Sequence, residues 1–273
     1  MAIKHVNEFN TMEIRPWNKP RAKNEKDIVN PFIASRIPMG LNFLDIDHSK
    51  PLQIKAHIDN MTDTLMPAVH LDASGDTILY SAGCSWLDIV GESDRDFQWG
   101  PCGFYSGDKP TAEITFDRPF NRPPKVIVWI DELNLSEKKN WRLKAYAENV
   151  TKTGFTLCAP HTNDTTVLGI GTCWIACPDN RSHISIGNFN TADSGASCHG
   201  QQNSKSIKFD KKFDCAPRVF LALSGFDIDG GSNLRIKTYT KNVTASGMEV
   251  HIDTWGDTRM NSGIASYIAF QEY

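Results

Sequence analysis

The order of apolar and polar positions along this chain is typical of short β-strands. The run KVIVWI at 125–130 is almost wholly apolar, which predicts a strand covered on both faces. The segments RLKAYA at 142–147 and RIKTYT at 235–240 alternate, which predicts strands with one solvent-facing side. Turn residues such as GGSN at 230–233 separate these runs. Because no segment sustains an apolar period of 3.6 with helix caps, the pattern predicts an all-β chain.

The same pattern occurs twice, in two segments of closely similar sequence. Residues 124–177 and 217–270 align without a gap at a constant offset (217 − 124 = 93). The matched positions are Asn140 with Asn233, Arg142 with Arg235, Asn149 with Asn242, Gly154 with Gly247, Asp164 with Asp257, and Trp174 with Tyr267. Such a period identifies a repeat that must be recognised before any fold is assigned.

A third, more divergent copy precedes these two. Within residues 38–89, Asn60 falls on Asn149, Lys55 on Lys144 and Trp86 on Trp174 once a shorter first loop is allowed. Upstream, FNT at 9–11 mirrors FNT at 189–191. We therefore expect three tandem small antiparallel β-sandwiches of about six strands each, spanning 1–92, 93–180 and 181–273. The short polar joins at 91–99 and 178–185 are expected to be hinges between packed modules.

Four elements follow one another along the chain: the Phe-x-x-x-Phe entries (Phe116 and Phe120, Phe209 and Phe213), the Asn-Leu-Arg element at 233–235, the Asn-Val-Thr-x-x-Gly turn, and the TWGDT loop at 254–258. Taken in order, they resemble the H-type lectin domain of snail agglutinins and of the discoidin carboxy-terminal region. The resemblance implies a β-sandwich that binds terminal galactose or N-acetylgalactosamine without catalysis, as in agglutination and cell adhesion. Members of this family assemble as trimers, so three copies in one chain predict either an intrachain pseudo-trimer or a trimer of whole chains.

Composition narrows the classes of partner. The charged fraction is 22% and the net charge −3, which leaves no basic footprint for nucleic acid. The chain has no apolar run of about 18 residues, so no membrane-spanning segment is predicted. The first residues, MAIKHVNEFN, lack a signal-peptide core, so we expect synthesis in the cytosol, with release by a non-classical route left open. Hydrolase, zinc-protease and phosphate-loop motifs are missing, so neither an enzyme nor a cofactor is expected.

The strongest candidate site lies in the third repeat. Arg235, Trp255 and Asp257 supply a planar donor fork, an aromatic surface and a carboxylate, which suit the paired hydroxyls and the apolar face of a neutral sugar. The resemblance implies that Arg235 and Trp255 contact the sugar. Gly256 stands where snail agglutinins carry histidine, so one polar contact is missing or replaced. The alternative interpretation makes Arg235 a surface salt-bridge residue and Trp255 a loop anchor.

The other two copies depart from this set. The second repeat keeps Arg142 and has polar candidates in His161, Asn163 and Asp164, but Thr162 takes the tryptophan position. In the first repeat we assign Gln53 to the arginine position and Ala73 to the tryptophan position, and predict that sugar binding is lost there.

The family also uses an Asp and a Gly from the loop before the Phe-x-x-x-Phe entry. The candidates here are Gly107 and Asp108 in the second repeat, and Asp193, Gly195 and His199 in the third. An ordinary turn role explains these residues equally well.

Three further patterns have structural explanations. Cys173 and Cys177 share a strand face and could ligate zinc, but buried reduced thiols are favoured. Asp227-Ile-Asp229 and Asp45-Ile-Asp47 resemble the start of a calcium loop, yet lack its downstream Gly and Glu. The Asn-x-Thr triplets match the N-glycosylation pattern, but their recurrence is explained by a turn in each repeat that favours asparagine. Two functions remain open: a multivalent lectin, or a structural or protein-binding module that kept the sandwich and lost the sugar.

Overall fold

A computed structural model of the chain describes residues 3–28, 37–59, 67–89, 97–137, 139–178, 183–194 and 201–271. The first unit contains β1 (Ile3–Asn10), β2 (Glu25–Asp27), β3 (Met39–Ile46), β4 (Leu52–Ile58), β5 (Ala68–Ala73) and β6 (Leu79–Ile89). The second contains β7 (Gln98–Tyr105), β8 (Thr111–Thr115), β9 (Lys125–Leu135), β10 (Trp141–Lys144), β11 (Tyr146–Glu148), β12 (Gly154–Cys158) and β13 (Val167–Cys177). The third contains β14 (Ile184–Asn190), β15 (Ser204–Lys208), β16 (Arg218–Ile228), β17 (Leu234–Thr244), β18 (Gly247–Asp253) and β19 (Met260–Phe270).

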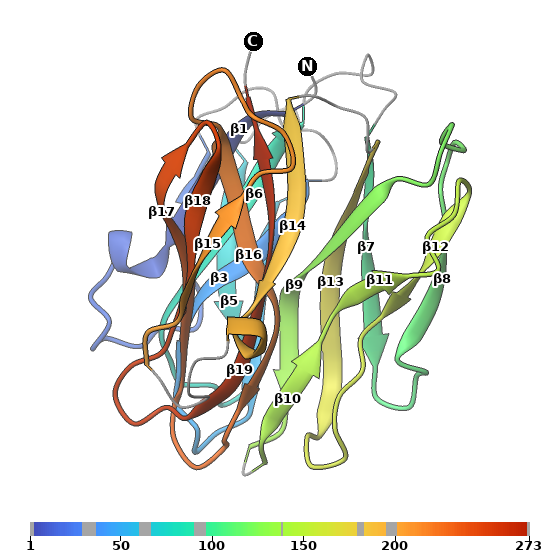
Figure 1. The fold of residues 1–273 in the computed structure, drawn as a ribbon. Helices are drawn as coiled ribbons and strands as arrows, with labels where there is room; N and C mark the ends of the chain where they lie inside the picture. Colours follow the sequence, from blue (N-terminus) through green and yellow to red (C-terminus); the bar gives the residue numbers. More distant parts are fainter. Residues whose placement is uncertain are drawn as a thin grey trace.

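Each unit arranges its strands in the same antiparallel order (Figure 1). One layer has the orders β1-β6-β3, β7-β13-β9 and β14-β19-β16. The facing layer has β2-β5-β4, β8-β12-β11 and β15-β18-β17, with β10 continuing the line of β11. The predicted all-β class and the tandem sandwiches are thus confirmed. The only helical elements among the described residues are the short 3₁₀ turns η1 (Thr11–Glu13) and η2 (Thr191–Ser194). None of them could cross a membrane.

Strand pairing also joins one unit to the next. β4 of the first unit pairs with β9 of the second, β10 of the second with β16 of the third, and β17 of the third with β3 of the first. Each pairing is antiparallel and joins corresponding strands, so the three junctions close a ring. A layer of one unit thereby continues into the facing layer of its neighbour, which satisfies edge strands that would otherwise expose unpaired backbone groups.

A central core lies between the layers β1-β6-β3, β7-β13-β9 and β14-β19-β16 of the three units. This core contains Leu87, Phe97, Ile127, Trp129, Ile175, Cys177, Ile184, Ile186, Phe220, Ala222, Ile268 and Phe270. Trp129 is fully buried, donates its indole N–H to the Ser266 carbonyl at 2.9 Å, and packs edge-on to Phe220 at 4.5 Å. The units are therefore held together by apolar packing as well as by strand pairing.

Corresponding positions in the central core differ in size. Strand register places Trp129 of β9, Ala222 of β16 and Gly40 of β3 at the same position of their units. A Cβ atom added to Gly40 would lie 2.6 Å from the Ala222 Cβ and 2.8 Å from the Trp129 Cβ. One large, one small and one absent side chain thus share this space, which is too small for three indoles.

The recurrent Asn-Val-Thr-x-x-Gly turn has a backbone explanation. Asn149 and Asn242 adopt φ of 52° and 50°, the left-handed region that asparagine tolerates better than most residues. Added Cβ atoms on Gly154 and Gly247 would lie 2.2 and 2.3 Å from the carbonyls of Ile114 and Ile207. These triplets are therefore explained by turn geometry, while Asn60 of the first repeat lies outside the described residues.

Other sequence expectations have clear outcomes. Trp86, Trp174 and Tyr267 are buried core residues, as their shared repeat position predicts. Cys173 and Cys177 are both buried, and burial raises the pKa of the Cys173 thiol to about 12. The joins at 91–99 and 178–185 fall mostly outside the described residues, and the exact repeat boundaries stay a prediction.

We predict that Gly40→Ala destabilises the chain by about 1–3 kcal/mol, because the new methyl group overpacks the central core. The matched control is Gly231→Ala, since a Cβ there meets nothing within 4 Å. Urea denaturation followed by tryptophan fluorescence would measure both. A Gly40→Ala midpoint equal to that of the wild type would show that the ring does not close as tightly as described.

Candidate functional site

Arg235 lies on β17 at the third–first junction. Strand register places it directly opposite Asp45 of β3, and its side chain is 20% exposed. Arg235 Nε lies 3.3 Å from Asp45 Oδ1, and Nη1 donates to Asp257 of its own unit. Within the described part of the chain these contacts occupy Nε and Nη1, which leaves the Nη2 amino group to donate to a ligand.

The two carboxyl groups beside Arg235 differ in environment. Hydrogen bonding from Arg235 lowers the pKa of the exposed Asp257 carboxyl. Burial raises the pKa of Asp45, with Arg235 acting in the opposite direction. Asp257 therefore remains an ionised acceptor at neutral pH, whereas Asp45 mainly holds the guanidinium in place.

The loop at 254–258 carries Trp255 and is fixed to the residue that precedes β17. Thr258 donates its hydroxyl to the Asn233 carbonyl at 2.6 Å, and the Gln201 side chain donates to the Gly256 carbonyl at 2.7 Å. Gly256 has φ +66°, and a Cβ there would lie 2.7 Å from Arg235 Nη1. Histidine at this position would displace the flexible end of the arginine and would strain the backbone, so the local geometry favours glycine.

These side chains line a hollow of about 650 Å³ between the third and first units. The first unit contributes Met12, Trp17, Phe43, Asp45, Tyr80 and Ser81, and the third contributes Asn233, Arg235, Lys237, Trp255, Gly256 and Asp257. Trp255 packs against Phe43 with ring centroids 5.1 Å apart. The hollow therefore offers aromatic surfaces beside a donor fork and carboxylates.

Trp17 stands on the first-unit loop that follows η1 and is 57% exposed. Its ring makes an edge contact with Tyr80 at 6.3 Å. The buried Arg15 anchors this loop by donating to the Tyr80 carbonyl at 2.7 Å and to the Asn24 side chain at 2.6 Å. A buried guanidinium with several acceptors holds a loop firmly, so Trp17 is presented on a fixed support.

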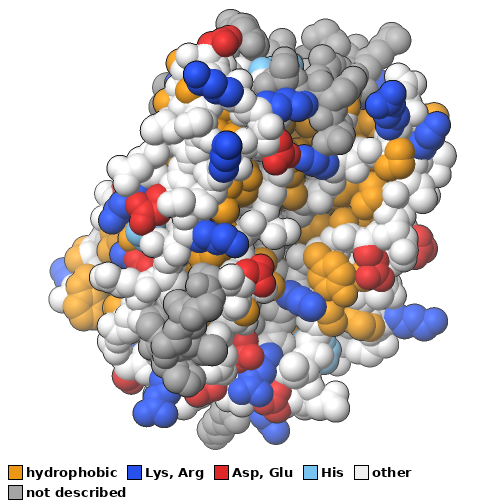
Figure 2. All heavy atoms as spheres, viewed as in Figure 1, with side chains coloured by type: hydrophobic (Ala, Val, Ile, Leu, Met, Phe, Trp, Pro, Cys, Tyr) orange, Lys and Arg blue, Asp and Glu red, His pale blue; other side chains and the backbone are white. Residues whose placement is uncertain are grey.

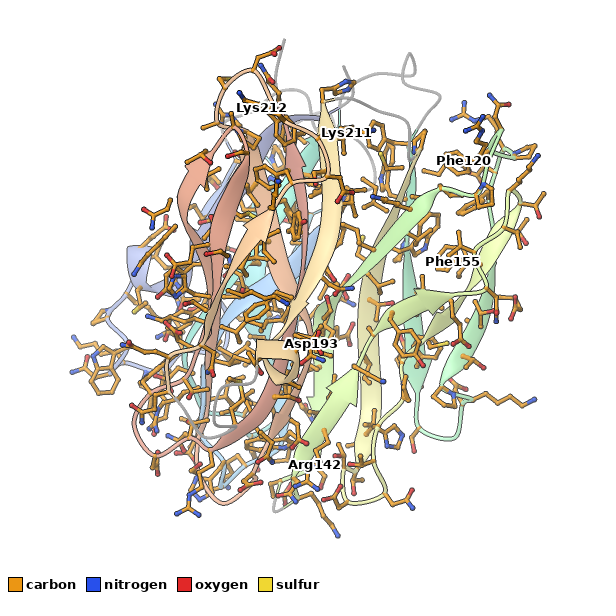
Figure 3. All side chains as sticks on the ribbon, viewed as in Figure 1. Phe120, Arg142, Phe155, Asp193, Lys211 and Lys212 are labelled. Carbon is orange, nitrogen blue, oxygen red and sulfur yellow. The ribbon has the colours of Figure 1, made fainter. Side chains whose placement is uncertain are left out.

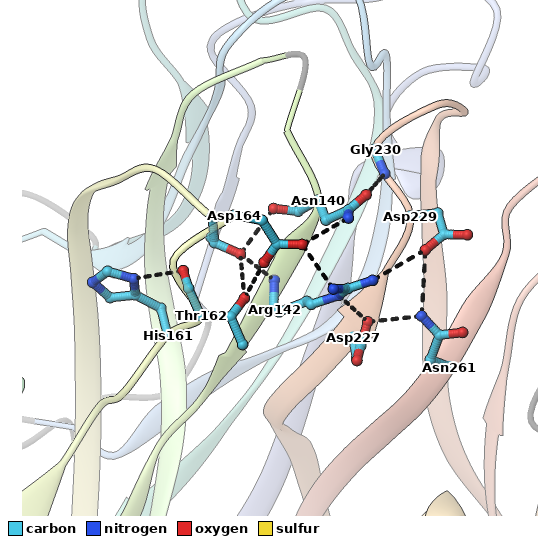
Figure 4. Close-up of polar contacts among 10 residues, drawn as sticks. Asn140, Arg142, His161, Thr162, Asp164, Asp227, Asp229, Gly230 and Asn261 are labelled. Atoms are coloured by element: carbon cyan, nitrogen blue, oxygen red, sulfur yellow. Dashed lines mark hydrogen bonds and ion pairs between the residues drawn. The ribbon is translucent and has the colours of Figure 1, made fainter.

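Arg142 occupies the corresponding place at the second–third junction (Figure 4). Its Nε donates to Asp227 at 2.8 Å, Nη1 to Asp164 at 2.7 Å, and Nη2 lies 3.6 Å from Asp229. Asn261 bridges the two third-unit carboxylates at 2.9 and 3.3 Å. All three guanidinium nitrogens thus face carboxylates, which leaves Arg142 less able to donate to a ligand than Arg235.

The remaining second-repeat candidates surround this network without an aromatic surface. Thr162 donates its hydroxyl to Asp164, and the His161 ring lies 3.2 Å from the Thr162 carbonyl. Hydrogen bonds from Thr162 and Asn140, with a further contribution from Arg142, lower the pKa of Asp164. Asn163 is exposed in the same loop.

The asparagine of the Asn-x-Arg element also contacts the neighbouring unit. Asn233 accepts from the His48 amide at 3.2 Å, and Asn140 accepts from the Gly230 amide at 3.1 Å. The element therefore builds two junctions: its asparagine receives a backbone N–H, and its arginine meets a carboxylate.

The first–second junction lacks this element. Gln53 stands opposite Asn134, where the other junctions pair arginine with aspartate. Our assignment of Ala73 to the tryptophan position is wrong by one residue, because Ala73 is buried in β5. Ser74 takes that place: its amide donates to the Gln53 carbonyl as the Thr162 amide does to Arg142.

The loop candidates lie apart from the Arg235 hollow. Asp193 of η2 lines a groove with Lys144 and Tyr146 of the second unit, and Figure 3 shows it at mid-height, with Arg142 near the lower end. Figure 2 shows hydrophobic side chains along β9 and β11 in this region. Asp108 closes a turn by accepting from the Tyr105 amide at 2.7 Å, and Gly107 has φ +93° in that turn. His199 and Gly195 lie outside the described residues.

Residue-by-residue analysis missed the contributions of neighbouring units, namely Phe43, Asp45, Trp17 and Tyr80 to one junction and Asp227 to another. A signal for the carboxylates exists in the repeats. The Asp-x-Asp pair is present in the first and third copies and absent from the second, where Asn134 and Ser136 stand instead. The arginine is absent from the first copy, so both losses fall at one junction once the copies pair in a ring.

The chain is similar to a curated protein, to solved structures and to one family model. A curated relative from Fuscovulum blasticum, ATP synthase subunits region ORF 7, is 33% identical over 63 residues, covering 23% of this chain and 55% of the relative. The chain thus spans about half of that protein.

Two solved structures of discoidin II from Dictyostelium discoideum, the wild type and the native recombinant protein, each share 14% identity with this chain. They match with TM-scores of 0.29 and 0.28, covering 64% and 63% of this chain and 82% and 83% of theirs.

The model of the H-type lectin domain matches residues 111–177 and 204–270. Neither segment lies in the first third of the chain, although its strands follow the same order. The two matched segments contain Arg142 and the Arg235–Trp255–Asp257 set, respectively. The chain therefore carries two segments that match the H-type lectin domain, a carbohydrate-binding type of module.

Proposed function

We propose that this protein is a non-catalytic lectin that binds glycans ending in galactose or N-acetylgalactosamine, with its principal site in the hollow at the third–first junction. The observation that carries the proposal is the convergence of Arg235, Trp255 and Asp257 in one hollow of about 650 Å³. The match of residues 204–270 to the H-type lectin domain supports the same site.

The chemistry of the hollow suits a neutral sugar. The Nη2 amino group of Arg235 can donate to a pair of neighbouring hydroxyl oxygens, and the Asp257 carboxylate can accept from a hydroxyl. The indole of Trp255 offers a flat apolar surface to the C–H face of the ring. The volume exceeds the needs of one sugar ring and falls in the range of roughly 300–1,000 Å³ that is typical of ligand pockets. A glycan of two or more residues could therefore extend toward Trp17.

The second–third junction is proposed as a weaker site. Arg142 faces Asp164, Asp227 and Asp229, and no aromatic side chain replaces Trp255 in its loop. A sugar hydroxyl would have to compete with carboxylates for the guanidinium. The first–second junction, with Gln53 and Asn134, is proposed to be without sugar binding.

We also propose that the divergent first unit is a worn copy of the same module and that the ring of junctions is an intrachain counterpart of a lectin trimer. The shared strand order and the three corresponding junctions support this arrangement. Covalent linkage replaces a bimolecular association with a high effective concentration, so one copy can lose its site and still serve as a neighbour.

A structural or protein-binding module is the second candidate. Both arginines make ion pairs across junctions between units, and such pairs could be retained for assembly alone. Arg142 fits that role well, because its guanidinium is surrounded by carboxylates. The two candidates differ in what removal of each arginine does to glycan binding.

We expect Arg235→Ala to weaken glycan binding about 10- to 100-fold, because charge-assisted hydrogen bonds contribute about 1.5–3 kcal/mol. Arg142→Ala is the matched control, since it removes an equivalent junction ion pair without an aromatic neighbour, and should change binding less than about threefold. A galactose and N-acetylgalactosamine glycan array, followed by calorimetry, would measure both. Equal losses in the two variants, or no wild-type signal, would favour the structural module.

Trp255→Ala should weaken monosaccharide binding by about 1–2 kcal/mol, roughly five- to thirtyfold, through loss of the aromatic surface. Trp17→Ala should affect longer glycans more than monosaccharides. Leu168→Ala, which removes an exposed apolar side chain of β13 outside this hollow, serves as the control. Calorimetric titration with a monosaccharide and an oligosaccharide separates these effects. An unaltered affinity in Trp255→Ala would place the sugar outside this hollow.

Sedimentation velocity should give a single-chain mass of about 30.5 kDa, because each junction is already satisfied within the chain. A species three times heavier would instead support a trimer of whole chains.

A further inference from the structure

Two histidines and an aspartate lie together at the edge of the first unit, outside the proposed sugar sites. His57 of β4 and His70 of β5 face each other as a cross-strand pair, and their rings stack with centroids 4.7 Å apart. Asp59 follows β4, and its Oδ2 lies 3.0 Å from His70 Nε2. One possible ligand atom from each of the three residues lies within 4.8 Å of the others.

One ring nitrogen of the pair has no hydrogen-bond partner, and another faces a carboxylate. His57 Nδ1 is buried without a hydrogen-bond partner among the described residues, whereas the buried His70 Nε2 faces Asp59 Oδ2 at 3.0 Å. Buried polar atoms in folded proteins are nearly always paired, so the unpaired His57 nitrogen beside this contact needs an explanation.

The other units show that packing alone does not require this set. The corresponding cross-strand pairs are Tyr146 with Cys158 and Tyr239 with His251. The third-unit rings stack in the same way, at 4.6 Å, but the Tyr239 hydroxyl donates to Asp253 at 2.7 Å. A stacked pair therefore also forms in the third unit, whereas two imidazoles with a carboxylate occur in the first unit alone among the described residues.

We propose that His57, Asp59 and His70 bind a divalent transition-metal ion, zinc in the first place, through His57 Nδ1, His70 Nε2 and a carboxylate oxygen of Asp59. Two imidazoles and one carboxylate suit zinc, which binds nitrogen at about 2.0–2.1 Å and carboxylate oxygen at about 2.0–2.2 Å. Small side-chain rotations would draw the ligand atoms inward, and water would complete a tetrahedral site.

A further carboxylate is placed to orient one ligand. Glu25 Oε2 of β2 lies 3.7 Å from His70 Nδ1, the nitrogen left over when Nε2 binds the ion. Metal-binding histidines commonly donate their second ring N–H to a carboxylate, which fixes the tautomer. The bound ion would thus link β2, β5 and β4 along one edge of the first unit.

The position of the cluster indicates what the ion would do. His57 and Asp59 also line a cavity of about 780 Å³ between β4 and the second unit, with Lys55 and Glu132 further along its wall. This cavity adjoins the junction where Gln53 and Asn134 replace the arginine–aspartate pair. A metal that binds only the folded state stabilises it by mass action, so zinc would stabilise the unit whose junction has Lys55–Glu132 but lacks the arginine–aspartate pair.

The test is calorimetric titration of zinc into the full chain, prepared without a polyhistidine tag and treated with chelator, with cobalt(II) absorption as a second readout. We expect saturation at one ion per chain, and at least tenfold weaker binding in His70→Ala and in Asp59→Asn. His251→Ala, which removes the corresponding third-unit histidine, is the control and should bind as the wild type does.

Asp59 is half exposed, so Asp59→Asn should fold even if His70→Ala does not. A wild-type chain that shows no saturable zinc binding would overturn the proposal. So would unchanged affinity in Asp59→Asn, or an equal loss in His251→Ala.

Discussion

The structure depends on the antiparallel pairing of one strand from each unit with a strand of the next. Three such pairings turn the small sandwiches into a closed ring: β4 with β9, β10 with β16, and β17 with β3. A six-stranded sandwich alone leaves edge strands with unpaired N–H and C=O groups. Pairing these edges between units satisfies the backbone and brings side chains of different units face to face. The hollow beside Arg235 and the ion networks at the junctions are consequences of that pairing.

Closure within one chain allows the copies to differ where identical subunits could not. A threefold axis of identical subunits would place three copies of one side chain at the centre, whereas this chain places Trp129, Ala222 and Gly40 there. A single indole can then fill a space too small for three. Protein interiors are close-packed, so this asymmetry also ties each unit to its own position in the ring.

The three junctions, like the central core, differ from one another in their side chains. One combines an arginine with aromatic residues, one surrounds its arginine with carboxylates, and one has amides on both sides. Gln53 and Asn134 belong together physically, because a buried aspartate without its arginine would be an unpaired charge and an arginine without aspartate would lose its anchor. Loss of one partner therefore favours loss of the other.

The sequence by itself determined the strand class, the repeat and the pairing of Arg235 with Trp255 as candidate residues. Strand alternation and turn residues are local properties, and a gapless repeat carries family-like motifs in order. Arg235 and Trp255 stand on neighbouring strand ends of one unit, so their proximity follows from a short connection.

Tertiary structure alone decided which unit faces which. Asp45, Phe43 and Trp17 reach the Arg235 hollow from the other end of the chain, and no local period encodes that contact. The same applies to Asp193, which lies beside Lys144 of the second unit and apart from Arg235. The one-residue error at Ala73 arose because a shorter loop can be aligned in two ways, which strand register and the hydrogen bond between Ser74 and Gln53 distinguish. Contacts between units are set by how sheets close on one another, which depends on packing of the whole chain.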